Sequence, residues 1–99
     1  METVAVELGD LFVEPETVQV PAGSRLSVEV TNTGDLEHDL HLEGDVGTER
    51  LGTGESETAD FGVIDQDTEA WCTVPGHREA GMLLTIEVTA PVTEPPASP

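Results

Sequence analysis

Apolar and polar residues alternate with a period of two along several segments of this chain. The alternation is clearest at residues 26–31 and 84–89, and it is weaker at 4–8, 18–20 and 59–63. That period turns successive side chains to opposite faces of a β-strand, one toward a core and the other toward water. No segment has helical periodicity longer than a turn or two. The pattern therefore predicts an all-β protein.

Short turn sequences separate the predicted strands. They are Pro21-Ala22-Gly23, Thr33-Gly34-Asp35, Gly52-Thr53-Gly54 and Pro75-Gly76. Gly accepts positive φ and Pro fixes its own φ, so both are typical of tight turns. About seven short strands in one domain indicate a Greek-key antiparallel β-sandwich. We expect this domain to span residues 1–90, and the Pro-rich residues 91–99 to form a tail or linker.

The chain is strongly acidic. Its 99 residues include 21 Asp and Glu against three Arg and no Lys, which gives a net charge of −18. Because it lacks a basic patch, it is not expected to bind nucleic acid, and it should avoid anionic membrane surfaces. No apolar run approaches the ~20 residues that cross a bilayer, so no membrane insertion is expected. The acidic surface serves solubility or steers the protein toward a basic partner.

A soft set of metal-binding side chains lies near the C-terminus. Cys72, His77 and Met82 follow one another with four residues between each pair. Predicted strands at 69–72 and 83–89 tether their loop at both ends, so the three side chains can converge. A thiolate, an imidazole and a thioether suit copper, including Cu(I), and suit calcium or magnesium poorly. Met82 favours copper over zinc, because zinc sites rarely use a thioether.

A trigonal copper site with a weak axial Met needs a second imidazole. His38 is the candidate, because residues 38, 40 and 42 share one face of a predicted strand and the two leucines should point into the core. His38 would then lie at the end of the sandwich where the ligand loop closes. His41 has the opposite parity and should face water with Asp39 and Glu43.

These residues carry a resemblance to a known family. The pattern Asn-x-Gly-x-x-x-His at residues 32–38, followed by Cys-x-x-x-x-His-x-x-x-x-Met at residues 72–82, resembles the cupredoxins, or blue copper proteins. The long ligand loop is more similar to the rusticyanin and sulfocyanin type than to plastocyanin. Residues 70–82 resemble still more closely the cupredoxin domains fused to bacterial copper nitrite reductases and related multicopper oxidases. The resemblance covers roughly residues 3–90.

The resemblance implies a type 1 copper site that transfers one electron at a time and catalyses no reaction itself. His38, Cys72, His77 and Met82 would hold one copper ion. The implied partner is a redox protein or a tethered copper enzyme domain, with the isolated domain a monomer. The first residues have no cationic start and no apolar stretch. We expect an extracytoplasmic location, with any leader absent from this sequence.

The loop around His77 should contain the electron port. His77 is expected to lie nearest the surface of the four ligands. The residues around it form a small uncharged patch suited to close docking: Pro75, Gly76, Ala80 and Gly81.

One position departs from the family pattern. The residue after the first ligand His is often Asn in cupredoxins, where it helps to tie the two ligand loops together, and here it is Asp39. Its carboxylate can accept a hydrogen bond from Thr73. The added negative charge should favour Cu(II) and lower the reduction potential.

The same residues leave other interpretations open. A structural zinc site at His38, Cys72 and His77 would leave Met82 unexplained. A Cys–His nucleophile pair would indicate a cysteine hydrolase, for which the sequence offers no orienting third group. A metal-free sandwich would have Met82 as core and His77 at the surface. A copper site, in turn, also fits a relay domain cut from a copper nitrite reductase or multicopper oxidase, or a copper carrier.

Overall fold

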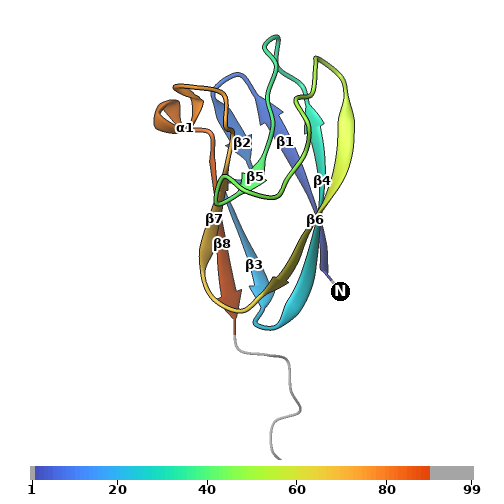
Figure 1. Cartoon of the computed structure of the whole chain (residues 1–99), viewed down its shortest axis with the longest axis vertical. Helices are drawn as coiled ribbons and strands as arrows, with labels where there is room; N and C mark the ends of the chain where they lie inside the picture. The colour runs from blue at the N-terminus through green and yellow to red at the C-terminus, as the bar shows by residue number, and fades with distance from the viewer. Residues whose placement is uncertain (1, 90–99) are drawn as a thin grey trace, which may run out of the picture.

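The structure is a computed structural model that describes residues 2–89, so the Pro-rich tail expected at 91–99 lies outside the described residues. Two four-stranded sheets form a sandwich (Figure 1). The first sheet has the order β2 (Phe12–Glu14), β1 (Glu2–Gly9), β4 (Ser24–Asn32) and β6 (Ser56–Ile64). The second has the order β3 (Thr17–Pro21), β8 (Leu83–Thr89), β7 (Thr68–Trp71) and β5 (His41–Leu42). The one-turn helix α1 (His77–Ala80) lies between β7 and β8 in sequence.

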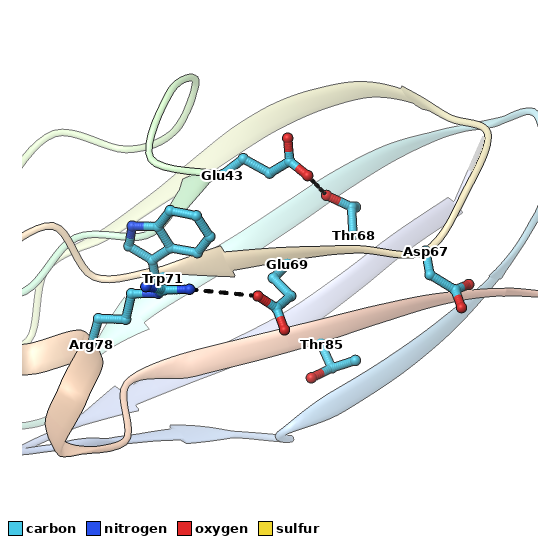
Figure 2. Close-up of a pocket in the computed structure, with 7 residues that line it drawn as sticks. All are labelled: Glu43, Asp67, Thr68, Glu69, Trp71, Arg78 and Thr85. Atoms are coloured by element: carbon cyan, nitrogen blue, oxygen red, sulfur yellow. Dashed lines mark hydrogen bonds and ion pairs between the residues drawn. The ribbon is translucent and has the colours of Figure 1, made fainter.

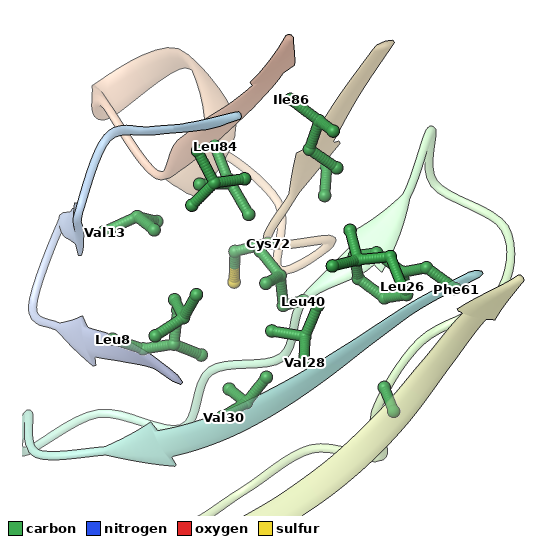
Figure 3. Close-up of a cluster of buried hydrophobic side chains, with 14 of the residues drawn as sticks. Leu8, Val13, Leu26, Val28, Val30, Leu40, Phe61, Cys72, Leu84 and Ile86 are labelled. Carbon is green, nitrogen blue, oxygen red and sulfur yellow. The ribbon is translucent and has the colours of Figure 1, made fainter. Parts of the chain in front are cut away.

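The alternation identified in the sequence builds the core. Leu26, Val28 and Val30 of β4 are fully buried from one sheet, and Leu84 and Ile86 of β8 from the other. Side chains of both sheets meet between the layers (Figure 3). Removing each such side chain from water stabilises the fold by about 1.5–3 kcal/mol. The predicted all-β sandwich is therefore confirmed.

The sheets are mixed, where the sequence analysis predicted antiparallel pairing throughout. β1 pairs in parallel with β4, with Glu2 opposite Leu26, and β3 pairs in parallel with β8, with Thr17 opposite Thr85. A period of two fixes which face a residue occupies but carries no information on strand direction. The structure also has eight strands among the described residues, one more than expected, because strands as short as β2 and β5 are too brief to show a period.

One end of the sandwich gathers the segments that carry the candidate ligands. The turn between β1 and β2, the connection that follows β4, and α1 all lie at the upper end in Figure 1. The backbone N–H of Thr33, just after β4, donates to the carbonyl of Leu8 at the end of β1, 2.8 Å away.

Within residues 2–89, no helix is long and apolar enough to cross a membrane.

Candidate metal centre

Three of the predicted ligands converge at this end of the sandwich. His38 Nδ1 lies 3.3 Å from His77 Nδ1, which lies 3.6 Å from Cys72 Sγ. All three donor atoms lie within 4.8 Å of one another, and no other His, Cys, Asp or Glu cluster of this kind occurs in residues 2–89. His38 and Cys72 are buried, whereas His77 is partly exposed.

The sheet places Cys72 and Met82 side by side. Cys72 directly follows β7 and has the parity of the buried Ala70, so its sulfur turns into the core, where Figure 3 shows it among apolar side chains. The backbone N–H of Cys72 donates to the carbonyl of Met82 at 3.2 Å, which extends the pairing of β7 with β8 by one step. Met82 is fully buried.

The loop between them folds back through a tight turn and a single helical turn. Gly76 has φ of +84°, a conformation that favours glycine, and α1 begins at the next residue, His77. The His77 N–H donates to the Val74 carbonyl at 3.0 Å, and the Met82 N–H donates to the His77 carbonyl at 3.0 Å. The segment from Cys72 to Met82 is thus a compact loop, in which Met82 is buried and His77 lies toward the surface.

Asn32 shapes the connection that leads to His38. Its side-chain amide is buried and donates to the carbonyls of Leu36 at 2.9 Å and Leu51 at 2.7 Å, while its Oδ1 accepts the N–H of Gly34 at 2.9 Å. His38 then exchanges backbone hydrogen bonds with Leu51. The Asn-x-Gly-x-x-x-His pattern is therefore a structural frame that fixes where His38 enters the core.

The expectation that Asp39 faces water is wrong. Its side chain is only 5% exposed, and it points to Thr73. The parity argument assumed one continuous strand from residue 38 to 42, but residue 38 forms an isolated bridge and β5 covers only His41–Leu42. Leu40 is buried as predicted.

His41 lies outside the metal cluster, as expected, but it does not simply face water. Its Nδ1 lies 2.8 Å from the carbonyl oxygen of Asp45, and its Nε2 lies 2.7 Å from that of Thr48. The side chain is 23% exposed. Both ring nitrogens are thus engaged by the backbone of residues 45–48, which leaves no nitrogen of His41 for the cluster.

Asp10, in the turn between β1 and β2, contacts His38, and the sequence did not predict this contact. Its Oδ1 lies 3.0 Å from Nε2 of His38. The hydrogen bond with His38, followed by those from the backbone N–H groups of Asp35 and Leu36, lowers the pKa of the Asp10 carboxyl. Its position after an alternating strand indicates only a turn residue, and no spacing in the sequence connects it with His38.

Burial affects the ionisation of Cys72 and of the neighbouring Asp39. Burial raises the pKa of the Cys72 thiol, and backbone hydrogen bonds from Asp39 and Val74 partly offset this effect. Burial also disfavours the charged form of Asp39. The two hydrogen bonds from Thr73, together with His41 and Arg50, outweigh that burial and lower the pKa of Asp39. The Asp39 carboxylate adds to the effect of burial at Cys72, because a negative charge nearby also raises the pKa of the thiol.

Arg78 fastens α1 to β7. Its guanidinium lies 4.1 Å from the centre of the Trp71 ring, and its Nη2 lies 3.7 Å from Oε1 of Glu69 (Figure 2). Both partners are on the outer face of β7, next to a pocket of about 580 Å³. Arg78, which follows His77, is thereby held against Trp71, which precedes Cys72.

The donor set fits a soft metal ion. Two imidazole nitrogens and a sulfur face one another in a cluster whose His38 and Cys72 are buried, and the backbone of Met82 pairs with that of Cys72. Trigonal N₂S donors with a weak thioether match copper in both oxidation states, whereas structural zinc sites are closed by Cys, His or carboxylate. The cluster contains no carboxylate among its three donors.

Comparisons with solved structures identify the fold. The chain is similar to the dithionite-reduced auracyanin of Roseiflexus castenholzii, with a TM-score of 0.77 and 21% identity over 88% of this chain and 96% of that one. It is also similar to auracyanin A, a "blue" copper protein of Chloroflexus aurantiacus, with a TM-score of 0.72 and 17% identity over 88% and 99% of the two chains. The blue copper oxidase of Nitrosomonas europaea matches 96% of this chain with 40% of its own length, at a TM-score of 0.72 and 19% identity.

No protein-family model and no curated protein sequence matches the chain. The structural matches agree with the sequence resemblance, and the chain has the cupredoxin fold.

Proposed function

We propose that this protein transfers single electrons through one type 1 copper ion held by His38, Cys72, His77 and Met82. The observation that carries the proposal is the convergence of two imidazole Nδ1 atoms and one thiol sulfur within 4.8 Å, in a cluster whose His38 and Cys72 are buried. Copper supplies the one-electron couple when bound. Auracyanin A, which shares the fold, is described as a blue copper protein.

The role of the chain is to keep the ligands in one geometry for both oxidation states. Backbone hydrogen bonds join Cys72 to Met82 and Met82 to His77, so the loop has little freedom to rearrange. His38 and Met82 are fully buried, which shields the cluster from water on every side except that of the partly exposed His77. A rigid site that is largely shielded from water minimises the reorganisation that accompanies an electron's arrival or departure.

Electrons would enter and leave through His77. It is partly exposed, whereas the other two members of the cluster are buried, and the neighbouring uncharged residues are solvent-exposed: Pro75, Gly76, Ala80 and Gly81. Leu11 extends the apolar character of this end, because it is 45% exposed and its carbonyl oxygen would lie 3.3 Å from a Cβ placed on Gly81. A nearly uncharged patch allows the close approach that electron transfer requires.

The partner would be a redox protein, and an extracytoplasmic location fits a protein of this kind. The net charge of −18 favours encounter with a basic partner at low salt. Electrochemistry tests transfer against the alternative of copper carriage. Reversible one-electron cycling with copper retained in the presence of a chelator is expected for transfer. Ready loss of copper to the chelator would instead indicate a carrier.

A second candidate role is that of an electron relay within a larger copper enzyme. It is favoured by the match of nearly the whole chain to 40% of the Nitrosomonas europaea blue copper oxidase. A tether supplies a high effective concentration, which makes charge steering unnecessary. Transfer rates to candidate partners should then be less sensitive to salt when the domain is fused through residues 91–99 than when it is free. Equal salt sensitivity in both forms would favour a free shuttle.

A further inference from the structure

Asp10 makes a contact with the candidate ligand His38 on the side of the ring away from the cluster. Nε2 of His38 lies 3.0 Å from Asp10 Oδ1, while Nδ1 of the same ring faces His77 Nδ1 at 3.3 Å. The two nitrogens of one buried imidazole therefore point to two different partners. One is a carboxylate and the other is the converging donor set.

The chain holds the Asp10 carboxylate firmly in this position. Its Oδ1 also accepts the N–H of Leu36 at 3.1 Å, and its Oδ2 accepts the N–H of Asp35 at 3.1 Å. Gly34 leaves the necessary space, because a Cβ at that position would collide with the carboxylate. Asn32 in turn fixes Gly34 and Leu36 through its side chain. Two backbone hydrogen bonds and one glycine thus aim the carboxylate at His38.

The chemistry of the pair determines which tautomer His38 adopts. An ionised carboxylate only accepts hydrogen bonds, so Nε2 must carry the proton and donate it to Asp10. A neutral imidazole has one N–H, and the lone pair is then on Nδ1. Nδ1 is the atom that faces His77 Nδ1, at 3.3 Å, in the cluster that also contains Cys72. The His38 nitrogen that carries the free lone pair is therefore the one that faces the metal-binding cluster.

We propose that Asp10 is a positioning residue for the metal centre. It fixes the tautomer and ring orientation of His38 and, through its negative charge, increases the electron donation of Nδ1. The inference rests on the proposed function, since it assigns Asp10 a role toward the copper that His38 would hold. It also connects the β1–β2 turn, far from the ligand loop in sequence, with the site.

The test compares Asp10→Asn with the control Asp35→Asn. Both remove one negative charge from the same end of the molecule, but Asp35 is exposed and only its backbone N–H is involved in the contact. An amide at position 10 cannot accept all three N–H groups, because its NH₂ is a donor. Asp10→Ser, a smaller residue, provides a second variant that removes the contact if the amide is poorly tolerated.

The first readout needs no metal. Long-range ¹H–¹⁵N NMR of the copper-free reduced chain at about pH 8, above the reference imidazole pKa of about 6.5, reports the tautomer of His38. The expected result is a proton on Nε2 in the wild type and in Asp35→Asn, and a mixed or inverted tautomer in Asp10→Asn. A proton on Nδ1 in the wild type, or the same tautomer in all variants, would overturn the proposal.

The second readout uses the copper-loaded chain. Asp10→Asn and Asp10→Ser should weaken copper binding about 10- to 100-fold and raise the reduction potential, with Asp35→Asn close to the wild type. If Asp35→Asn shifts the potential as far as Asp10→Asn does, general charge accounts for the effect and positioning is excluded. If the wild type forms no copper site at all, the proposed function fails, and the NMR result still decides whether Asp10 sets the tautomer.

Discussion

Asp39 accepts two hydrogen bonds from Thr73, one from the backbone N–H at 2.7 Å and one from the hydroxyl at 2.6 Å. Asp39 follows His38 and Thr73 follows Cys72, so this pair joins the two segments that carry the buried members of the cluster. Arg50 Nε donates to the same carboxylate at 3.2 Å. The side chain that the sequence predicted to face water is thus the connection between the ligand segments.

Replacing Asp39 with Ala should destabilise the copper-free chain by about 3 kcal/mol, because two hydrogen bonds to a charged group are lost and the partly buried donors of Thr73 are left without this acceptor. Asp39→Asn keeps one acceptor and should cost less. It should also raise the reduction potential, since a negative charge near the copper favours Cu(II). Chemical denaturation and voltammetry measure the two effects. The control is Asp45→Asn at an exposed position, and equal potentials in both variants would contradict the assignment.

Substitutions at Met82 distinguish a role in metal binding from a role in core packing alone. Met82→Leu conserves buried volume and should cost less than about 1.5 kcal/mol of stability. Copper should stay bound while the reduction potential rises, because the axial thioether is gone. Met82→Gln provides a stronger axial oxygen donor and should lower the potential. If both variants cycle at the wild-type potential, Met82 serves only as a core residue.

Arg78 should stabilise α1 through Trp71 and Glu69. Arg78→Ala removes one cation–π contact and one exposed ion pair, a loss of about 1 kcal/mol, which corresponds to a fall in Tm of about 4–8 °C. Arg78→Lys keeps the charge and should lose less. Arg25→Ala removes an exposed ion pair with Asp60 elsewhere on the sandwich and serves as the control. A larger Tm fall for Arg25→Ala than for Arg78→Ala would contradict the role given to the Trp71 contact.

Salt should stabilise the copper-free chain. With a net charge of −18, the acidic side chains repel one another in the compact state. Screening strengthens as the Debye length falls from about 30 Å at 0.01 M to about 3 Å at 1 M salt. The free energy of unfolding, measured by urea titration, should therefore rise over this range, and equally for sodium and potassium chloride. A constant or falling free energy of unfolding would show that repulsion between the acidic side chains does not destabilise the folded state.

The sequence was most informative where a simple period controlled burial. The alternation at Leu26–Val28–Val30 and at Leu84–Ile86 predicted both strands and their inward faces, because each strand is long and one-sided. The parallel pairing of β1 with β4 was not predicted, since strand direction depends on how the connections run. The spacing of the ligand loop was informative because both its ends are fixed by paired strands.

The contacts around the ligands were less accessible from the sequence. Asp39 was placed on the wrong face because the segment after His38 is a loop stabilised by side-chain contacts, where strand parity does not apply. Its hydrogen bond with Thr73 was nevertheless predicted, from the family resemblance. Asp10 and Arg50 reach the site through tertiary contacts that span 28 and 11 residues. No local pattern encodes such contacts.

The visible and EPR spectra of the chain loaded with Cu(II) test the central claim most directly. The two imidazoles, the Cys72 thiolate and the Met82 thioether predict an intense blue or green band from thiolate-to-copper charge transfer, with the EPR signal of a type 1 site. Cys72→Ser should abolish the band. A colourless protein that instead holds one stoichiometric zinc ion would contradict the account.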